Sequence, residues 1–200
     1  MQRRMRRDSF RTQYYEEYAY ILDVLPFAPP RIVSKTRWQG PVAQAIGEDY
    51  FTLLELIPRP GASLEVGERV FIGKGKRDKI SKILGRVSYE DLTANAKDEL
   101  RRIVELIVEK HEDRFVRFFN EARPITTRFH SLELLKGVGK KLLWDILKER
   151  EKKPFESFED IKSRTRLSDP KKAIVERILE ELMGNEKYYL FVKWRRLFNR

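Results

Sequence analysis

The sequence predicts an α+β protein in which a small N-terminal β-barrel is followed by an all-helical domain. Short runs of β-branched and aromatic residues, separated by Gly and Pro, occupy residues 14–90. Apolar residues then recur at helical spacing over residues 91–184. The chain has 200 residues, of which 41% are hydrophobic, so it can bury a substantial core.

Five apolar runs in the first half are expected to be strands. Hairpin-like joints, such as residues 47–49, separate them, and this pattern suggests a small closed barrel. The strand count and the run Val66–Ile72 resemble the OB-fold, whose members commonly bind oligonucleotides, although a fold alone does not establish a function. The five runs are residues 18–25, 42–46, 50–57, 68–72 and 80–87.

The loop of residues 73–79 is the first candidate for phosphate contact. It carries four cations against one carboxylate, and its spacing is not that of a nucleotide-binding P-loop. The alternative is a solvated hairpin tip. Trp38 lies in a polar stretch and is expected to be exposed as a stacking platform for a base. The four cations are Lys74, Lys76, Arg77 and Lys79.

The helical half begins where the composition changes at Asp91. Thr93 can cap a helix that runs to about Lys110, and an apolar face continues until Pro124. Residues 91–124 are therefore expected to bridge the barrel and the next unit. His111 and His130 lie at expected helix ends, where capping or solvation is the usual role.

Residues 131–150 are expected to form a tight hairpin between two short helices. Gly137 and Gly139 allow a sharp turn, and Val138 between them can point inward. The second helix should begin near Lys140, so its free amides and positive dipole end would lie beside Lys140 and Lys141. These features together favour one phosphate.

This stretch resembles the helix-hairpin-helix motif of DNA- and RNA-processing proteins, with Lys136 in place of the usual apolar residue or proline. The resemblance implies that Gly137, Val138, Gly139, Lys140 and Lys141 bind a backbone phosphate without reading sequence. It also implies a K⁺ or Na⁺ ion at hairpin carbonyls near Gly137 and Gly139. The alternative is a plain corner between helices with solvated lysines.

A second unit, residues 155–183, resembles a degenerate half of a tandem helix-hairpin-helix domain. Ser157 is expected to cap one helix, Asp169 with Pro170 to start another, and Gly184 to end it. Residues 185–200 are aromatic and basic, and we expect residues 188–192 to pack as a strand or a helix. Residues 1–13 are either an unpacked start or a basic arm.

The overall charge favours a polyanionic partner. Lys and Arg number 42 against 31 Asp and Glu, which gives a formal net charge of +11. Cysteine is absent, so disulfides and thiolate chemistry are excluded. No apolar run has the length of a membrane span, and no signal peptide is apparent, so we expect a cytoplasmic protein.

We therefore expect a non-catalytic protein that binds RNA or DNA with little sequence preference. One alternative is an adaptor or scaffold in a ribosome-associated or DNA-repair complex. Another is a DNA glycosylase/lyase, because Lys141 lies two residues after the second hairpin glycine and Asp160 follows at a suitable interval. The sequence around Asp160 does not resemble the corresponding glycosylase element.

The layout of a barrel-like half before a helix-hairpin-helix half resembles an uncharacterised archaeal family, domain of unknown function 655, described as predicted RNA-binding. The likeness covers most of the chain from about Tyr14. It implies nucleic-acid binding and supplies no catalytic residues.

Overall fold

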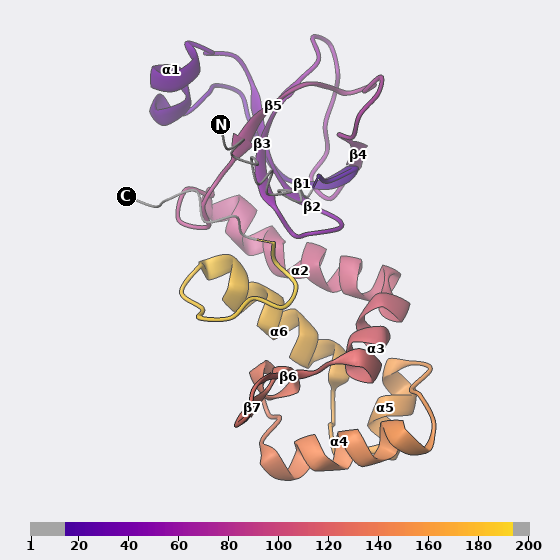
Figure 1. The fold of residues 1–200 in the computed structure, drawn as a ribbon. Coiled ribbons are helices and arrows are strands. Elements are labelled where there is room, and N and C mark those ends of the chain that lie inside the picture. The colour runs from indigo at the N-terminus through magenta and orange to yellow at the C-terminus, as the bar shows by residue number, and fades with distance from the viewer. Residues whose placement is uncertain (1–14, 194–200) are drawn as a thin grey trace, which may run out of the picture.

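A computed structural model describes residues 15–193 and has an α+β fold (Figure 1). A curled antiparallel sheet forms one end of the molecule, and a long helix, α2, crosses beneath it. The helices that follow α2 in the chain lie beyond it, with α4 farthest from the sheet. The predicted arm of residues 1–13 and the arginines after residue 193 lie outside the described residues.

The five predicted strands are present, in the sheet order β4-β1-β2-β3-β5 with every neighbouring pair antiparallel. The expected closure of the barrel is wrong, because β4 and β5 are not paired within the described part of the chain. Strand β4 is only three residues long and offers little edge for a ladder. The strands are β1 (Tyr18–Leu25), β2 (Val42–Gly47), β3 (Leu53–Pro58), β4 (Arg69–Phe71) and β5 (Ile80–Arg86).

A short helix, α1 (Pro30–Thr36), interrupts the sheet between β1 and β2 and was not predicted. Pro30 stands at its first position, where the fixed φ of proline suits a helix start. The three neighbouring prolines mark only a break in the strand pattern, so a helix of seven residues left little periodic signal.

Strand β1 is buried on both faces because side chains alternate across a strand. Ala19 and Ile21 point into the curl of the sheet, where they pack with other small and aliphatic residues. Tyr20 and Leu22 point the other way and join the large core formed by the helices. One face of the sheet therefore shares the large core with the helices, and the curl of the sheet encloses a second, smaller core.

Two consecutive helices, α2 (Ala94–Lys110) and α3 (Glu112–Glu121), follow the sheet, as the apolar periodicity predicted. The Thr93 side chain accepts a hydrogen bond from the Ala96 amide at 3.0 Å, so the predicted cap is confirmed. No helix in the described part of the chain is long and apolar enough to cross a membrane.

Two short helices were expected around Gly137, and this prediction is wrong for the first of them. Residues 131–134 form only one 3-10 turn, η1 (Ser131–Leu134), because the backbone becomes extended at Leu135; His130 and Glu133 cap the start of this turn reciprocally. A two-stranded ribbon precedes it, formed by β6 (Pro124–Thr126) and β7 (Phe129–His130). The helices that follow are α4 (Lys140–Lys152), α5 (Phe158–Arg164) and α6 (Pro170–Met183).

The predicted ends of α5 and α6 are confirmed. Ser157 accepts a hydrogen bond from the Asp160 amide, and Asp169 accepts one from the Lys172 amide. Gly184 ends α6 with a φ of 86°. Each cap depends on residues close in sequence, which is why the pattern located them.

The segment after α6 returns to the sheet as neither strand nor helix over residues 185–193, contrary to both alternatives. Phe191 and Val192 are buried, as expected of this stretch. The fully buried Glu181 carboxylate accepts hydrogen bonds from the amides of residues 190, 191 and 192, and from Arg177 at 2.9 Å. The Glu181 carboxylate therefore accepts the backbone hydrogen bonds that a neighbouring strand would accept in a sheet.

Candidate nucleic-acid interface

The glycine turn between η1 and α4 is exposed at both glycines and anchored at the residue between them. Gly137 has a φ of 87°, which favours glycine, whereas Gly139 has an ordinary φ of −85°. Val138 is 5% exposed, as predicted, and its amide donates to the Leu135 carbonyl at 3.0 Å. A Cβ added at Gly137 or Gly139 would meet nothing within 4 Å, so both glycines border open space.

The first amides of α4 are free of partners within the described residues. Gly139 is the N-cap and offers no side-chain hydrogen bond, and the first helical bond runs from the Leu143 amide to the Gly139 carbonyl at 2.9 Å. The amides of Lys140, Lys141 and Leu142 therefore point out of the helix start unpaired. Together with the helix dipole they make a positive, donor-rich surface.

The two lysines of the turn differ in their surroundings. Lys141 is exposed and makes no hydrogen bond or ion pair with any residue of 15–193. The Lys140 ammonium donates to the Arg128 carbonyl at 2.8 Å and lies 2.8 Å from the Glu133 carboxylate. The hydrogen bond from Lys140 is the main reason that the pKa of Glu133 is lowered. Lys140 thus ties the helix start to the ribbon, and its charge is largely balanced.

Two further cations lie at the turn. Lys136, the residue before Gly137, is exposed. Arg128 is exposed at the turn of the ribbon, and its backbone carbonyl is the one that accepts the hydrogen bond from Lys140. We call the exposed residues of this region the hairpin surface; they are Arg128, Lys136, Gly137, Gly139, Lys140 and Lys141. Arg128 was missed because nothing in the sequence places residue 128 beside residue 140.

The loop of residues 73–79 offers fewer free cations than its composition suggested. Lys79 is paired with Glu68 at 2.5 Å, and the Arg77 guanidinium donates to the Gly73 carbonyl at 3.2 Å. Lys74 is exposed over the Tyr15 ring, and Lys76 is exposed. The loop lies on the sheet, at the opposite end of the molecule from α4, so the structure does not bring the two predicted phosphate sites together (Figure 1).

Trp38 is not the exposed platform that the polar stretch predicted. Its indole N–H donates to the Pro41 carbonyl at 3.1 Å, and its ring lies close over Gly40, where a Cβ would stand 2.7 Å from the ring. The side chain is half-buried. Polar neighbours in the sequence were misleading because the chain folds back on itself within three residues.

The carbonyls near the turn are partly used by the fold. The Gly139 carbonyl accepts the first hydrogen bond of α4, and the Leu135 carbonyl accepts from Val138. A monovalent cation would therefore have to share the Gly139 carbonyl with α4. Residues 15–193 contain no group of three or more His, Asp or Glu side chains that could hold a metal ion.

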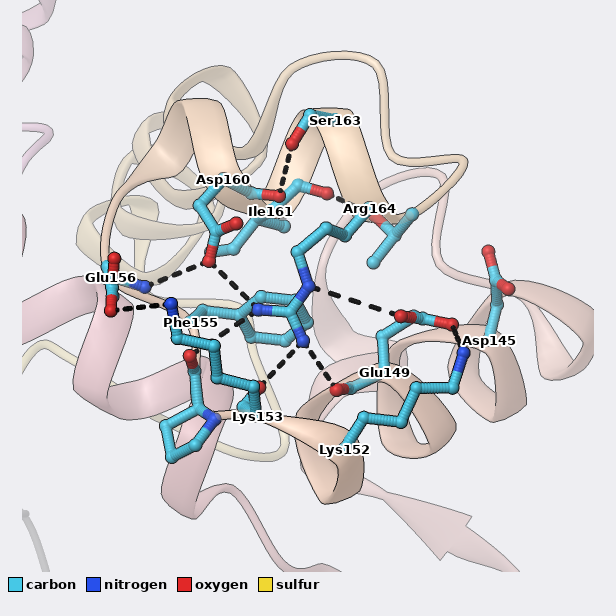
Figure 2. A network of polar contacts seen from close by, with 12 residues as sticks. Asp145, Glu149, Lys152, Lys153, Phe155, Glu156, Asp160, Ile161, Ser163 and Arg164 are labelled. Carbon is cyan, nitrogen blue, oxygen red and sulfur yellow. Dashed lines mark hydrogen bonds and ion pairs between the residues drawn. The ribbon is translucent and has the colours of Figure 1, made fainter.

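Arg164 fixes the far end of α4 to α5 (Figure 2). Its guanidinium donates to the Glu149 carbonyl at 2.6 Å, which also accepts from the Lys153 amide, and to the Lys153 carbonyl at 2.7 Å, just after the end of α4. It also pairs with Asp160 at 2.9 Å and covers the Phe155 ring at 4.6 Å. The second unit therefore packs against the first, as expected, and holds α4 in place.

The carboxylates that a lyase reaction would need are not beside Lys141. Asp160 is held by Arg164 and the Glu156 amide near the C-terminal end of α4, and Glu159 is exposed beside Lys162. Lys141 lies at the N-terminal end, eight residues before Glu149, which corresponds to about 12 Å along a helix. The pairing of Lys141 with Asp160 is therefore not present in this arrangement.

Comparisons with known proteins agree on one family. A family model described as "Protein of unknown function (DUF655)" matches residues 15–193. An uncharacterized protein of Methanocaldococcus jannaschii is 49% identical over 186 residues, which span 92% of this chain and 83% of that protein. A crystal structure of a protein from Archaeoglobus fulgidus, Af1531, has a TM-score of 0.78 at 48% identity and covers 89% of this chain and 100% of its own. On this match, which runs through both the sheet and the helices, the chain belongs to the DUF655 family.

Proposed function

We propose that this protein is a non-catalytic nucleic-acid-binding protein that contacts backbone phosphates through its hairpin surface. The observation that carries the proposal is the coincidence, at one exposed turn, of unpaired amides, two glycines bordering open space, and the unpaired Lys141. Such a surface can hydrogen-bond a phosphate oxygen and neutralise its charge without contacting a base.

The turn belongs, in this proposal, to the helix-hairpin-helix class. Burial of Val138 between two exposed glycines and the helix start at Lys140 support that assignment, even though η1 is a single turn. The half of the chain before α2 is proposed to be an OB-like barrel that is left open. Its strand order, β4-β1-β2-β3-β5, supports this because closing the gap between β4 and β5 would complete a five-stranded barrel.

A cytoplasmic location and either RNA or DNA as the partner belong to the same proposal. The net charge of +11 supports a polyanion, although many of the cations are paired within the fold. Because the hairpin surface offers few unpaired charges, we expect contact with about three to five phosphates in all. The logarithm of the binding constant should then fall against the logarithm of salt with a slope of about −3 to −4 on duplex and about −2 to −3 on a single strand.

The test removes charge from the turn and leaves its internal contacts intact. Lys136 and Lys141 are changed to alanine together, while Lys140 is kept because it holds Glu133 and the Arg128 carbonyl. Binding to duplex DNA, to duplex RNA and to single strands of unrelated sequence is measured at several salt concentrations. The double variant should bind all of them more weakly and flatten the duplex slope by about 1.8, since each lost phosphate contact contributes about 0.9.

A matched control removes two lysines elsewhere. Lys35, on α1, and Lys162, on α5, are exposed, and Lys162 faces only the exposed Glu159 at 3.7 Å. Their double alanine variant has the same net charge as the test variant and should keep the wild-type slope. If both double variants lose the same affinity, the loss is explained by net charge alone. If the test variant keeps the wild-type affinity, the hairpin surface is not part of the interface.

A further inference from the structure

Trp144 is a large aromatic side chain that the fold leaves outside. It lies on α4, one turn after the glycine turn, and is 68% exposed. Its ring has no aromatic or cation partner, and its indole N–H has no acceptor, within residues 15–193. Trp is usually packed because it carries a large apolar area, so an indole left free of the core is available to a ligand.

The orientation of Trp144 is fixed by its neighbours on α4. Leu143 and Ile146 are buried at 4% and 0% exposure and hold the opposite face of the helix against the core. Successive side chains are rotated by about 100° around a helix, so residue 144 must point outward when these two point inward. The indole therefore cannot be buried without turning α4 over.

Lysines flank the indole on both sides along the helix. Lys140 and Lys141 precede Trp144 by four and three residues, and Lys148 follows it by four, spacings that place side chains next to one another on a helix surface. Lys141 and Lys148 have no ion-pair partner in the described part of the chain. They are about 10.5 Å apart along the axis, which places one unpaired charge on each side of the ring.

We propose that this ridge selects single-stranded nucleic acid, with an unpaired base stacked on Trp144 and the flanking phosphates held by Lys141 and Lys148. The inference rests on the proposed function and names its substrate class. A base in a duplex has both faces covered by its neighbours, so an indole on a convex helix can reach a base face only where the strand is unpaired. The lysines alone would serve single and double strands alike.

The experiment compares the full-length protein with Trp144→Ala and Trp144→Phe. Dissociation constants are measured at one salt concentration for an oligouridylate and an oligothymidylate of about 12 nucleotides, and for matched RNA and DNA duplexes. Loss of one stacked base should weaken single-strand binding roughly 5- to 150-fold in Trp144→Ala. Duplex binding should be unchanged, and Trp144→Phe should recover most of the single-strand affinity because phenylalanine also presents a ring face.

The outcomes separate this inference from the proposed function. Wild-type protein that binds none of the four probes would refute the proposed function itself. Binding that Trp144→Ala leaves unchanged, or weakens equally on single strands and duplexes, would overturn the role of the indole and leave phosphate binding standing. A loss restricted to oligouridylate or to oligothymidylate would support the stacking and identify the nucleic acid as RNA or DNA.

Discussion

The carboxylate of Glu48 is expected to be a pH-sensitive joint between the sheet and the helices. It is buried and accepts hydrogen bonds from Arg69 at 2.6 Å, from Lys110 at 2.8 Å, and from Tyr20 at 3.2 Å, while His111 lies at 3.0 Å. Arg69 belongs to β4, Lys110 ends α2, and His111 lies between α2 and α3 as the cap residue of both. Glu48 therefore joins the edge of the sheet to the junction of two helices.

The contribution of Glu48 to the free energy of unfolding can be worked out from its pKa. Burial raises this pKa, but the hydrogen bonds from Arg69, Lys110 and His111 outweigh burial and lower it from 4.5 to about 2. At about 1.4 kcal/mol for each pH unit, that difference has an upper bound of about 3.4 kcal/mol in the free energy of unfolding. Because Arg69 and Lys110 are 35% and 43% exposed, solvent screening reduces the expected value to about 1–2 kcal/mol.

Because the pKa of Glu48 is lowered in the folded chain, its contribution to the free energy of unfolding decreases as the pH falls. The contribution is complete well above pH 4.5, where the carboxylate is ionised in both the folded and unfolded chains, and is lost as the pH falls through 4.5 towards 2. Urea unfolding of the wild type and of Glu48→Gln is measured between pH 7 and pH 2.5. The difference between the two should be largest at pH 7 and should shrink by about 1–2 kcal/mol across the acid range. A difference that stays constant with pH would refute this reasoning, because the amide cannot titrate.

Three further variants test how the chain is held after α6 and at the glycine turn. Glu181→Gln should lower the free energy of unfolding by about 1.5–3 kcal/mol and make residues 186–193 sensitive to proteases, because the amides of residues 190–192 and Arg177 lose a charged acceptor, although Arg177 keeps Glu186; guanidinium unfolding and limited proteolysis measure this, and wild-type protease resistance would contradict it. Gly137→Ala should cost about 1 kcal/mol because its φ is 87°, whereas Gly139→Ala, at −85°, should cost less; thermal unfolding of the pair decides, and equal losses would refute the strain argument.

The parts of the fold that follow local rules could be predicted from the sequence. The caps at Thr93, Ser157 and Asp169 depend on a side chain and an amide three residues apart, so a short pattern contains all the information. The start of α4 at Lys140 and the burial of Val138 follow in the same way from the glycines around them.

What the sequence left undetermined depends on contacts between distant residues. Whether Lys140 is free or paired is decided by Glu133 and by the Arg128 carbonyl, and the latter approaches only because the β6–β7 ribbon folds back. Whether the sheet closes is decided by whether β4 and β5 meet, and these two strands are not paired in the described part of the chain. Neither the pairing of Lys140 nor the closure of the sheet can be predicted from a short sequence motif.

Trp144 is an intermediate case. The run Leu142–Leu147 reads as one apolar stretch, and it conceals that residue 144 is a third of a turn away from Leu143 on the helix surface. A helical projection that begins at Lys140 places Trp144 among the lysines. The signal was present but needed the helix boundary as well as the composition.

If the proposed function holds, the contacts at the two ends of α4 should matter for binding. Arg164 ties its C-terminal carbonyls to α5, and Lys140 ties its first turn to the ribbon, so both ends are fixed before any ligand arrives. A phosphate and a base that meet the hairpin surface and Trp144 would then encounter groups already held in place, and little ordering of the protein would oppose binding. Loosening either end should therefore weaken affinity even where no contacting residue is changed. Arg164→Ala, which contacts neither the turn nor Trp144, is the variant in which that coupling can be measured.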